Sequence, residues 1–117
     1  MWTTLTLILT VISAISISGQ SKVRQLLQNE RVSSYDLTIE PETVEPGFHE
    51  HKLPYFYVAL SAGTARIRYP NGTSEVIDYK PGDARWGIAE RHAVDNIGNT
   101  VLHFVIADIK DAVKPPS

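Results

Sequence analysis

The hydrophobic and polar positions of this chain follow the short alternations that are typical of β-strands. From Val23 onward, β-prone apolar runs are separated by turn residues roughly every eight to twelve positions, a spacing typical of sandwiches and barrels. No segment after residue 22 has a helical period. The pattern predicts an all-β domain, with strands that include residues 23–27, 31–40, 55–60, 65–69, 76–79 and 101–109.

The sequence Pro70-Asn71-Gly72 is the clearest hairpin signal in the chain. An Asn-Gly pair tolerates the positive φ angles that a type I′ turn requires. We therefore predict that the strands before and after it form a β-hairpin. A second turn is predicted at Pro81-Gly82-Asp83, before the segment that carries the third histidine.

Residues 2–17 form an apolar run, and no charged residue precedes Lys22. Its length is typical of a signal-peptide core and is short for a membrane span, which needs about 20 apolar residues. We expect residues 1–18 to be a signal peptide and the protein to be exported, either periplasmic or secreted. The usual basic residues before the run are missing, so an uncleaved membrane anchor, or an extra strand of a cytoplasmic protein, remains the alternative.

Length and composition limit the remaining choices. The 117 residues suit one domain, which we place at 22–110, followed by a disordered Pro-rich tail at 111–117. Eleven Lys and Arg against thirteen Asp and Glu give a net charge of −2, which argues against a nucleic-acid partner. The absence of cysteine excludes disulfides, thiolate metal ligands and a cysteine nucleophile.

The four histidines are the candidate metal ligands. His49 and His51 are two positions apart, so in a strand they lie on one face about 6.6 Å apart along the chain and can share one ion. Glu50 between them points to the other face. His92 is the third candidate. His103, on the last predicted strand, is either an additional ligand or an ordinary strand histidine.

The sequence around these histidines resembles that of small single-domain proteins of the cupin superfamily. The resemblance covers roughly residues 23–109, and its most similar segments are 29–32, 80–83 and 92–99, with the His49-x-His51 pair after Pro46-Gly47-Phe48. It implies a double-stranded β-helix, which is a jelly-roll barrel, in one domain. It also implies that His49, His51 and His92 bind a divalent metal ion.

Several positions depart from the family pattern. Thr43 stands at the opening Gly of the first motif, and in the second motif Ile88 and Glu90 replace Pro and Gly. Counting back from Gly63 places Phe56 where the family has its metal-binding Glu. The resemblance therefore implies a three-histidine site that lacks the usual carboxylate.

The same count predicts that Phe56 lines the metal pocket, with Val58 beside it on the same strand parity. Trp86 is a further candidate for the pocket wall. Tyr55 and Tyr57 are expected in the core or on the sheet surface instead. The glutamates between residues 40 and 50 are expected to form a solvated edge, with a loop carboxylate at the ion as the alternative.

Arg85 and Arg91 flank the second motif. We expect both to be surface arginines, and the alternative is that they orient an anionic substrate. No catalytic acid or base is assigned from the sequence, and no catalytic triad or phosphate loop is present.

Three neutral imidazoles leave a divalent ion its full charge, so the site favours anionic or bidentate oxygen ligands. The ligand type does not separate Fe, Zn, Ni, Mn and Cu, and we expect Fe(II) or Zn. Some cupins with three histidine ligands are Fe(II) dioxygenases, which implies a dioxygenase acting on a small enolate or carboxylate.

Two other functions remain open. One is a non-catalytic module that binds a metal or a small ligand, and the other is a metal-free structural domain or a cofactor-independent isomerase. The resemblance also implies a homodimer, in which edge strands would be covered.

Overall fold

Residues 21–110 are described by the computed structural model, and the predicted signal peptide (1–18) and tail (111–117) lie outside the described residues. The described chain forms nine strands and no helix. The strands are β1 (Ser21–Gln28), β2 (Val32–Ile39), β3 (His49–His51), β4 (Tyr55–Ala59), β5 (Gly63–Arg68), β6 (Ser74–Tyr79), β7 (Ala84–Gly87), β8 (Glu90–Asn96) and β9 (Leu102–Ile109).

A search of the described residues finds no helix with the length and apolar character needed to cross a membrane.

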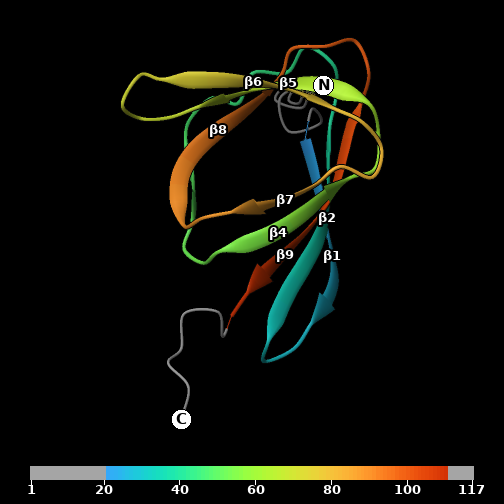
Figure 1. Cartoon of the computed structure of the whole chain (residues 1–117), viewed down its shortest axis with the longest axis vertical. Coiled ribbons are helices and arrows are strands. Elements are labelled where there is room, and N and C mark those ends of the chain that lie inside the picture. Colours follow the sequence, from blue (N-terminus) through green and yellow to red (C-terminus); the bar gives the residue numbers. More distant parts are fainter. Residues whose placement is uncertain (1–20, 111–117) are drawn as a thin grey trace, which may run out of the picture.

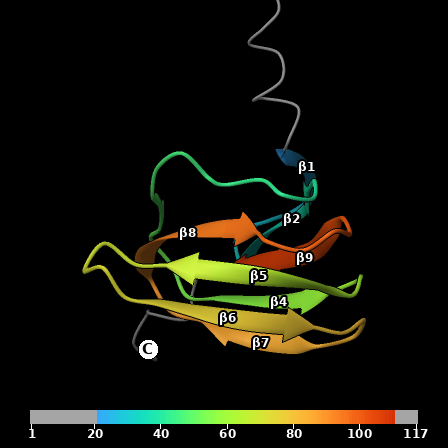
Figure 2. The same cartoon turned by 90° about the horizontal axis from the view of Figure 1, so that it is seen from above.

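The strands form two antiparallel sheets. One sheet has the order β1-β2-β9-β4-β7 and the other has the order β3-β8-β5-β6. Figure 1 shows β5 and β6 across the interior from β4 and β7, with β8 curving along one side, and Figure 2 shows the strands of both sheets running in similar directions. The prediction of an all-β jelly-roll barrel is confirmed.

The predicted hairpin joins β5 and β6, with Ile67 opposite Glu75. Its turn is not of type I′, which requires positive φ at both central residues. Gly72 has φ 92°, but Asn71 is not among the described residues with positive φ. The proline ring fixes φ of Pro70 near −65°, which excludes a type I′ turn here. The Gly72 N–H instead donates to the Tyr69 carbonyl at 3.0 Å.

Strands β7 and β8 were not predicted, because their residues lack a clean apolar alternation. β8 lies between β3 and β5. Both edges of β8 are therefore paired, and buried polar residues lie on both of its faces, with His92 on one face and Asp95 on the other. An analysis of hydrophobicity alone does not identify this central strand, because buried polar side chains interrupt its apolar pattern.

The core lies between the sheets and continues into the walls of a cavity. Leu102, Phe104 and Ile106 of β9 alternate inward, as the two-residue period of a strand requires. They pack with buried residues of the adjacent strands β2 and β4 (Ile39, Tyr55 and Ala59) and of the facing strands β5 and β6 (Ala65, Ile67, Ile77 and Tyr79).

The segment between β2 and β3 is held against β8 and β5. Thr43 and Asn96 exchange two backbone hydrogen bonds of 3.1 and 2.8 Å. Asp95 accepts the backbone N–H of Glu45 at 3.1 Å, and Arg68 donates to the Glu45 carbonyl at 2.7 Å. These contacts fix the backbone of Glu45, four residues before the first histidine of β3.

Candidate metal centre

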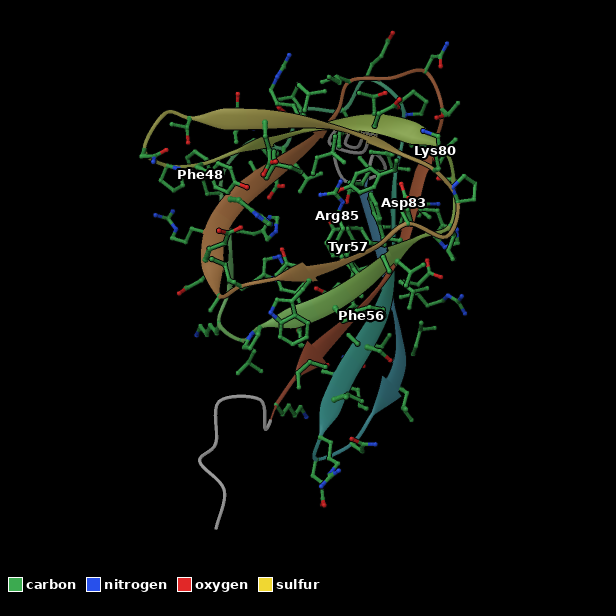
Figure 3. All side chains as sticks on the ribbon, viewed as in Figure 1. Phe48, Phe56, Tyr57, Lys80, Asp83 and Arg85 are labelled. Carbon is green, nitrogen blue, oxygen red and sulfur yellow. The ribbon has the colours of Figure 1, made fainter. Side chains whose placement is uncertain are left out.

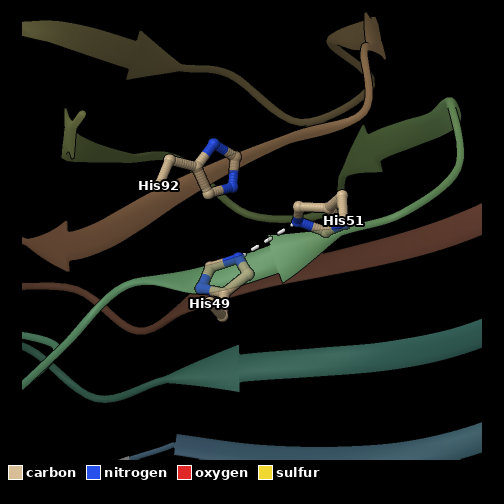
Figure 4. A group of neighbouring side chains, drawn as sticks. All are labelled: His49, His51 and His92. Carbon is tan, nitrogen blue, oxygen red and sulfur yellow. Dashed lines mark hydrogen bonds between the residues drawn. The ribbon is translucent and has the colours of Figure 1, made fainter. Parts of the chain in front are cut away.

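Three imidazoles meet at one side of the interior. His49 and His51 of β3 lie on one face, and the antiparallel register sets His92 of β8 directly opposite His49. The ring centroids are 4.7 to 4.9 Å apart, and one nitrogen of each ring lies within 4.8 Å of the others. Figure 4 shows the three rings facing a common centre. The structure thus brings together the three histidines selected from the sequence.

Two glutamates bind the far side of two of these rings. Glu45 Oε2 lies 2.6 Å from His49 Nδ1, and Glu90 Oε2 lies 3.0 Å from His92 Nδ1. Because an ionised carboxylate only accepts hydrogen bonds, each Nδ1 carries the proton. In the neutral ring Nε2 is then the unprotonated nitrogen, whose lone pair can bind a metal ion, as in the carboxylate–histidine pairs of metal sites.

Burial and neighbouring charges keep two of the histidines neutral, the form that binds a metal ion. Burial and the neighbouring histidines lower the pKa of His51 to about 4 and also lower the pKa of His92. Burial alone would raise the pKa of Glu45, but hydrogen bonds from His49 and the Val94 N–H outweigh it, so this pKa is lowered. At neutral pH, His51 and His92 are neutral and Glu45 is ionised.

The spacing of two of the donor atoms suits a shared divalent ion. His49 Nε2 and His51 Nε2 are 3.0 Å apart and form the hydrogen bond drawn in Figure 4. Two nitrogens that each lie about 2.1 Å from one ion are about 3.0 to 3.4 Å apart at common coordination angles. Among the described residues the cluster consists of three imidazoles without a carboxylate, a set that suits Fe, Zn, Ni or Cu.

The predicted pocket-lining role of Phe56 and Val58 is wrong. Both lie on the outer face of β4, and neither lines the cavity; Phe56 is 44% exposed. Figure 3 shows Phe56 on the opposite side of β4 from Tyr57. The count from Gly63 is one residue too late, and Tyr55 is the inward residue, its ring stacked on His51 at 4.1 Å.

Trp86 and His103 have different outcomes. Trp86 is among the residues that line the cavity, but it is 57% exposed and therefore lies at the rim. His103 lies outside the cluster, and its Nε2 is 2.8 Å from Asp36 Oδ1 on β2. Of the two alternatives for His103, the structure favours an ordinary strand histidine over an additional ligand, because its strand parity directs it away from the interior.

The histidines open onto a cavity of about 610 Å³ with mainly apolar walls. Tyr55 and Tyr57 belong to these walls. The hydroxyl groups of Tyr57 and Tyr79 form a hydrogen bond of 2.7 Å. Sequence reasoning missed Tyr79, whose only signal is its parity with buried Ile77. It also misplaced Glu45 on a solvated edge, because no local pattern shows that a loop carboxylate turns inward.

Gly87→Ala is expected to lower the free energy of unfolding by about 1 to 3 kcal/mol, as overpacking does. A Cβ at Gly87 would overlap the Tyr55 ring, and Tyr55 supports His51 by stacking. Urea unfolding would measure the loss. Gly47→Ala is the matched control, since a Cβ there meets nothing within 4 Å. Equal stability of both variants would contradict the close packing of Tyr55 on β7.

Comparisons with known proteins identify the fold. No family model and no curated protein sequence matches the chain. Among solved structures, a cupin domain from Bordetella pertussis is 24% identical with a TM-score of 0.69, covering 77% of this chain and 93% of that one. An RmlC-like cupin family protein with a double-stranded β-helix fold from Methanocaldococcus jannaschii is 17% identical, with a TM-score of 0.61 and coverage of 76% and 79%.

A variant of oxalate decarboxylase from B. subtilis is also similar, at 16% identity and a TM-score of 0.61, covering 81% of this chain and 26% of that protein. These likenesses, together with the two-sheet topology, show that the chain has the cupin fold, a double-stranded β-helix. Its three histidines form a group that could hold a metal ion. The resemblance seen in the sequence is therefore confirmed at the level of the fold.

Proposed function

We propose that this protein is a metal-binding cupin in which His49, His51 and His92 hold one divalent ion that binds a small oxygenated molecule. The observation that carries the proposal is the convergence of three imidazoles whose ring nitrogens lie within 4.8 Å of one another, at a site where burial lowers the pKa of His51. A divalent ion at this position would supply a Lewis acid for the oxygen atoms of the ligand. Fe(II) and Zn are the metals we favour.

The finer proposal is a dioxygenase that acts on an enolate or a carboxylate. The neutral imidazoles leave the ion's charge uncompensated, which favours an anionic ligand. Tyr57 and Tyr79 belong to the mainly apolar walls of the cavity, which would limit the access of water to the reacting groups. Tyr55 holds the ring of His51 in place by stacking.

A non-catalytic binding module is the second candidate. It is favoured by the engagement of the glutamates that line the cavity: Glu45 and Glu90 contact histidines, and Glu75 accepts the Tyr69 hydroxyl at 2.7 Å. In the described part of the chain, none of these three carboxylates is left unengaged to act as a general base.

Export and homodimer formation complete the proposal. The uncharged apolar run of residues 2–17 supports export, with a membrane-anchored or cytoplasmic protein as the alternative. The edge strand β1 supports a homodimer, because Val23 and Leu27 on this strand are exposed and the β1–β2 hairpin extends past the barrel in Figure 1. Pairing of this edge with a second copy would cover its open backbone groups.

Metal analysis of the full chain, purified without a histidine tag, tests the central proposal. We expect about one equivalent of iron or zinc in the wild type and less than a tenth of that in His49→Ala and His92→Ala, since each variant removes one of three ligands. His103→Ala is the matched control and should keep the metal, because its ring contacts Asp36 outside the cluster.

Oxygen uptake on a candidate enolate then separates the two functions. Iron that supports uptake favours the dioxygenase, and zinc without turnover favours the binding module. A wild type that holds no divalent metal after loading with iron and with zinc would sink the proposal.

A further inference from the structure

Arg85 of β7 is the only lysine or arginine among the described residues that line the cavity. It lies opposite Tyr57 in the β4–β7 register, and its guanidinium is 5.6 Å from the centroid of the Tyr79 ring. No carboxylate within residues 21–110 forms an ion pair with it. Figure 3 shows Arg85 and Tyr57 on the interior side of β4 and β7, and the exposure of Arg85 places it near the opening.

The two phenols beside this cation supply a neutral donor. Tyr57 and Tyr79 share one hydrogen bond of 2.7 Å, which uses one of their two hydroxyl protons. Burial raises the pKa of Tyr57 and of Tyr79, so both stay protonated at neutral pH. A guanidinium with a free O–H donor next to it is a combination that binds a carboxylate.

An aromatic wall joins this cation to the three-histidine cluster. His51 stacks on Tyr55 at 4.1 Å, and Tyr55 lies 5.8 Å from Tyr57, between ring centroids. Tyr57 lies 6.1 Å from Tyr79, over which Arg85 is placed. The cavity therefore has a metal-ligand end and a cationic end, with apolar surface between them.

From this arrangement we infer that the ligand is an acid with an apolar body, whose carboxylate binds Arg85 and whose oxygen-bearing head lies at the histidines. The inference rests on the proposed metal site for the head and on Arg85 for the carboxylate. The engaged glutamates of the cavity do not neutralise Arg85, because they contact His49, His92 and Tyr69.

Hydroxamates with alkyl chains of several lengths, each ending in a carboxylate or in a carboxamide, test the two ends of the cavity separately. The hydroxamate group tests the metal site, and the terminal group tests Arg85. They are titrated calorimetrically into the full chain, zinc-loaded and metal-free. For at least one length we expect the carboxylate to bind roughly tenfold more tightly than its amide, as a charge-assisted hydrogen bond allows. Arg85→Gln should remove this preference and leave the affinity for the amide unchanged.

Arg91→Gln is the matched control, because Arg91 lies over Phe48 outside the cavity lining and should keep the preference. Arg85→Lys, which keeps the charge, should retain part of it. The inference is overturned if the carboxylates bind no more tightly than the amides at any chain length, or if this preference is unchanged in Arg85→Gln. In either case, zinc-dependent binding of the amides still supports the metal site. A preference that survives without zinc supports the Arg85 subsite alone, and binding of no compound overturns both.

Discussion

Replacing Arg68 with methionine should lower the free energy of unfolding by about 3 to 5 kcal/mol, the usual cost of leaving a buried carboxylate without its partner. Arg68 binds Asp95 through two hydrogen bonds of 2.8 and 3.0 Å. Asp95 is 1% exposed, whereas the side chain of Arg68 is 31% exposed. Loss of the arginine therefore leaves the buried Asp95 carboxylate without its ion-pair partner, at a place that water does not reach.

The same substitution should weaken metal binding by about tenfold, because groups behind metal ligands set their orientation. Arg68 donates to the carbonyl of Glu45 at 2.7 Å, and the Glu45 carboxylate binds His49. Urea unfolding and competitive zinc titration measure the two effects. Arg66→Met, an exposed arginine on the same strand, is the matched control.

Asp95→Asn should cost less than Arg68→Met, because the partly exposed guanidinium of Arg68 can be hydrated by water. If Arg68→Met were as stable as Arg66→Met, the buried ion pair would contribute nothing to the fold. If stability fell but zinc affinity did not, the link from Arg68 through Glu45 to His49 would be wrong.

Asn96→Ala should lower the free energy of unfolding by about 2 to 4 kcal/mol, because it removes three hydrogen bonds to the backbone, one of them buried. The amide nitrogen of Asn96 donates to the carbonyls of Ile39 and Thr100 at 3.0 and 2.8 Å, and its oxygen accepts the Gly98 N–H at 3.0 Å. Asn96 is 1% exposed and its contact with the Ile39 carbonyl is buried, so water does not replace that contact.

Thermal and urea unfolding of Asn96→Ala measure this loss, with the exposed Asn99→Ala as the matched control. We expect the control to stay within about 0.5 kcal/mol of the wild type, as surface substitutions usually do. Equal stability of the two variants would contradict the role of Asn96 in joining the end of β8 to β2.

The histidine pair could be predicted because its signal is local. Two residues that are two apart in a strand share a face whatever the rest of the chain does, so the placement of His49 and His51 followed from parity. The same rule failed for Phe56, because a count from Gly63 crosses a turn and an error of one residue reverses the face. Tyr55, not Phe56, contacts His51.

Other parts of the site depend on contacts between distant segments. Glu45 reaches His49 only because Arg68 and Asp95 hold its backbone. Arg85 faces Tyr79 only because β7 pairs with β4 on the sheet opposite β6. No local pattern in the sequence carries either contact.

By itself, the sequence determined an all-β barrel and, through its resemblance to cupins, three histidines as one candidate site. These features rest on a two-residue period and on short motifs, which are properties of neighbouring residues. The tertiary structure alone decided which carboxylates contact the imidazoles, which tyrosine supports them and where the cavity places its one cation among the described residues. Strand register and loop closure determine these contacts, because they join segments that are far apart in the chain.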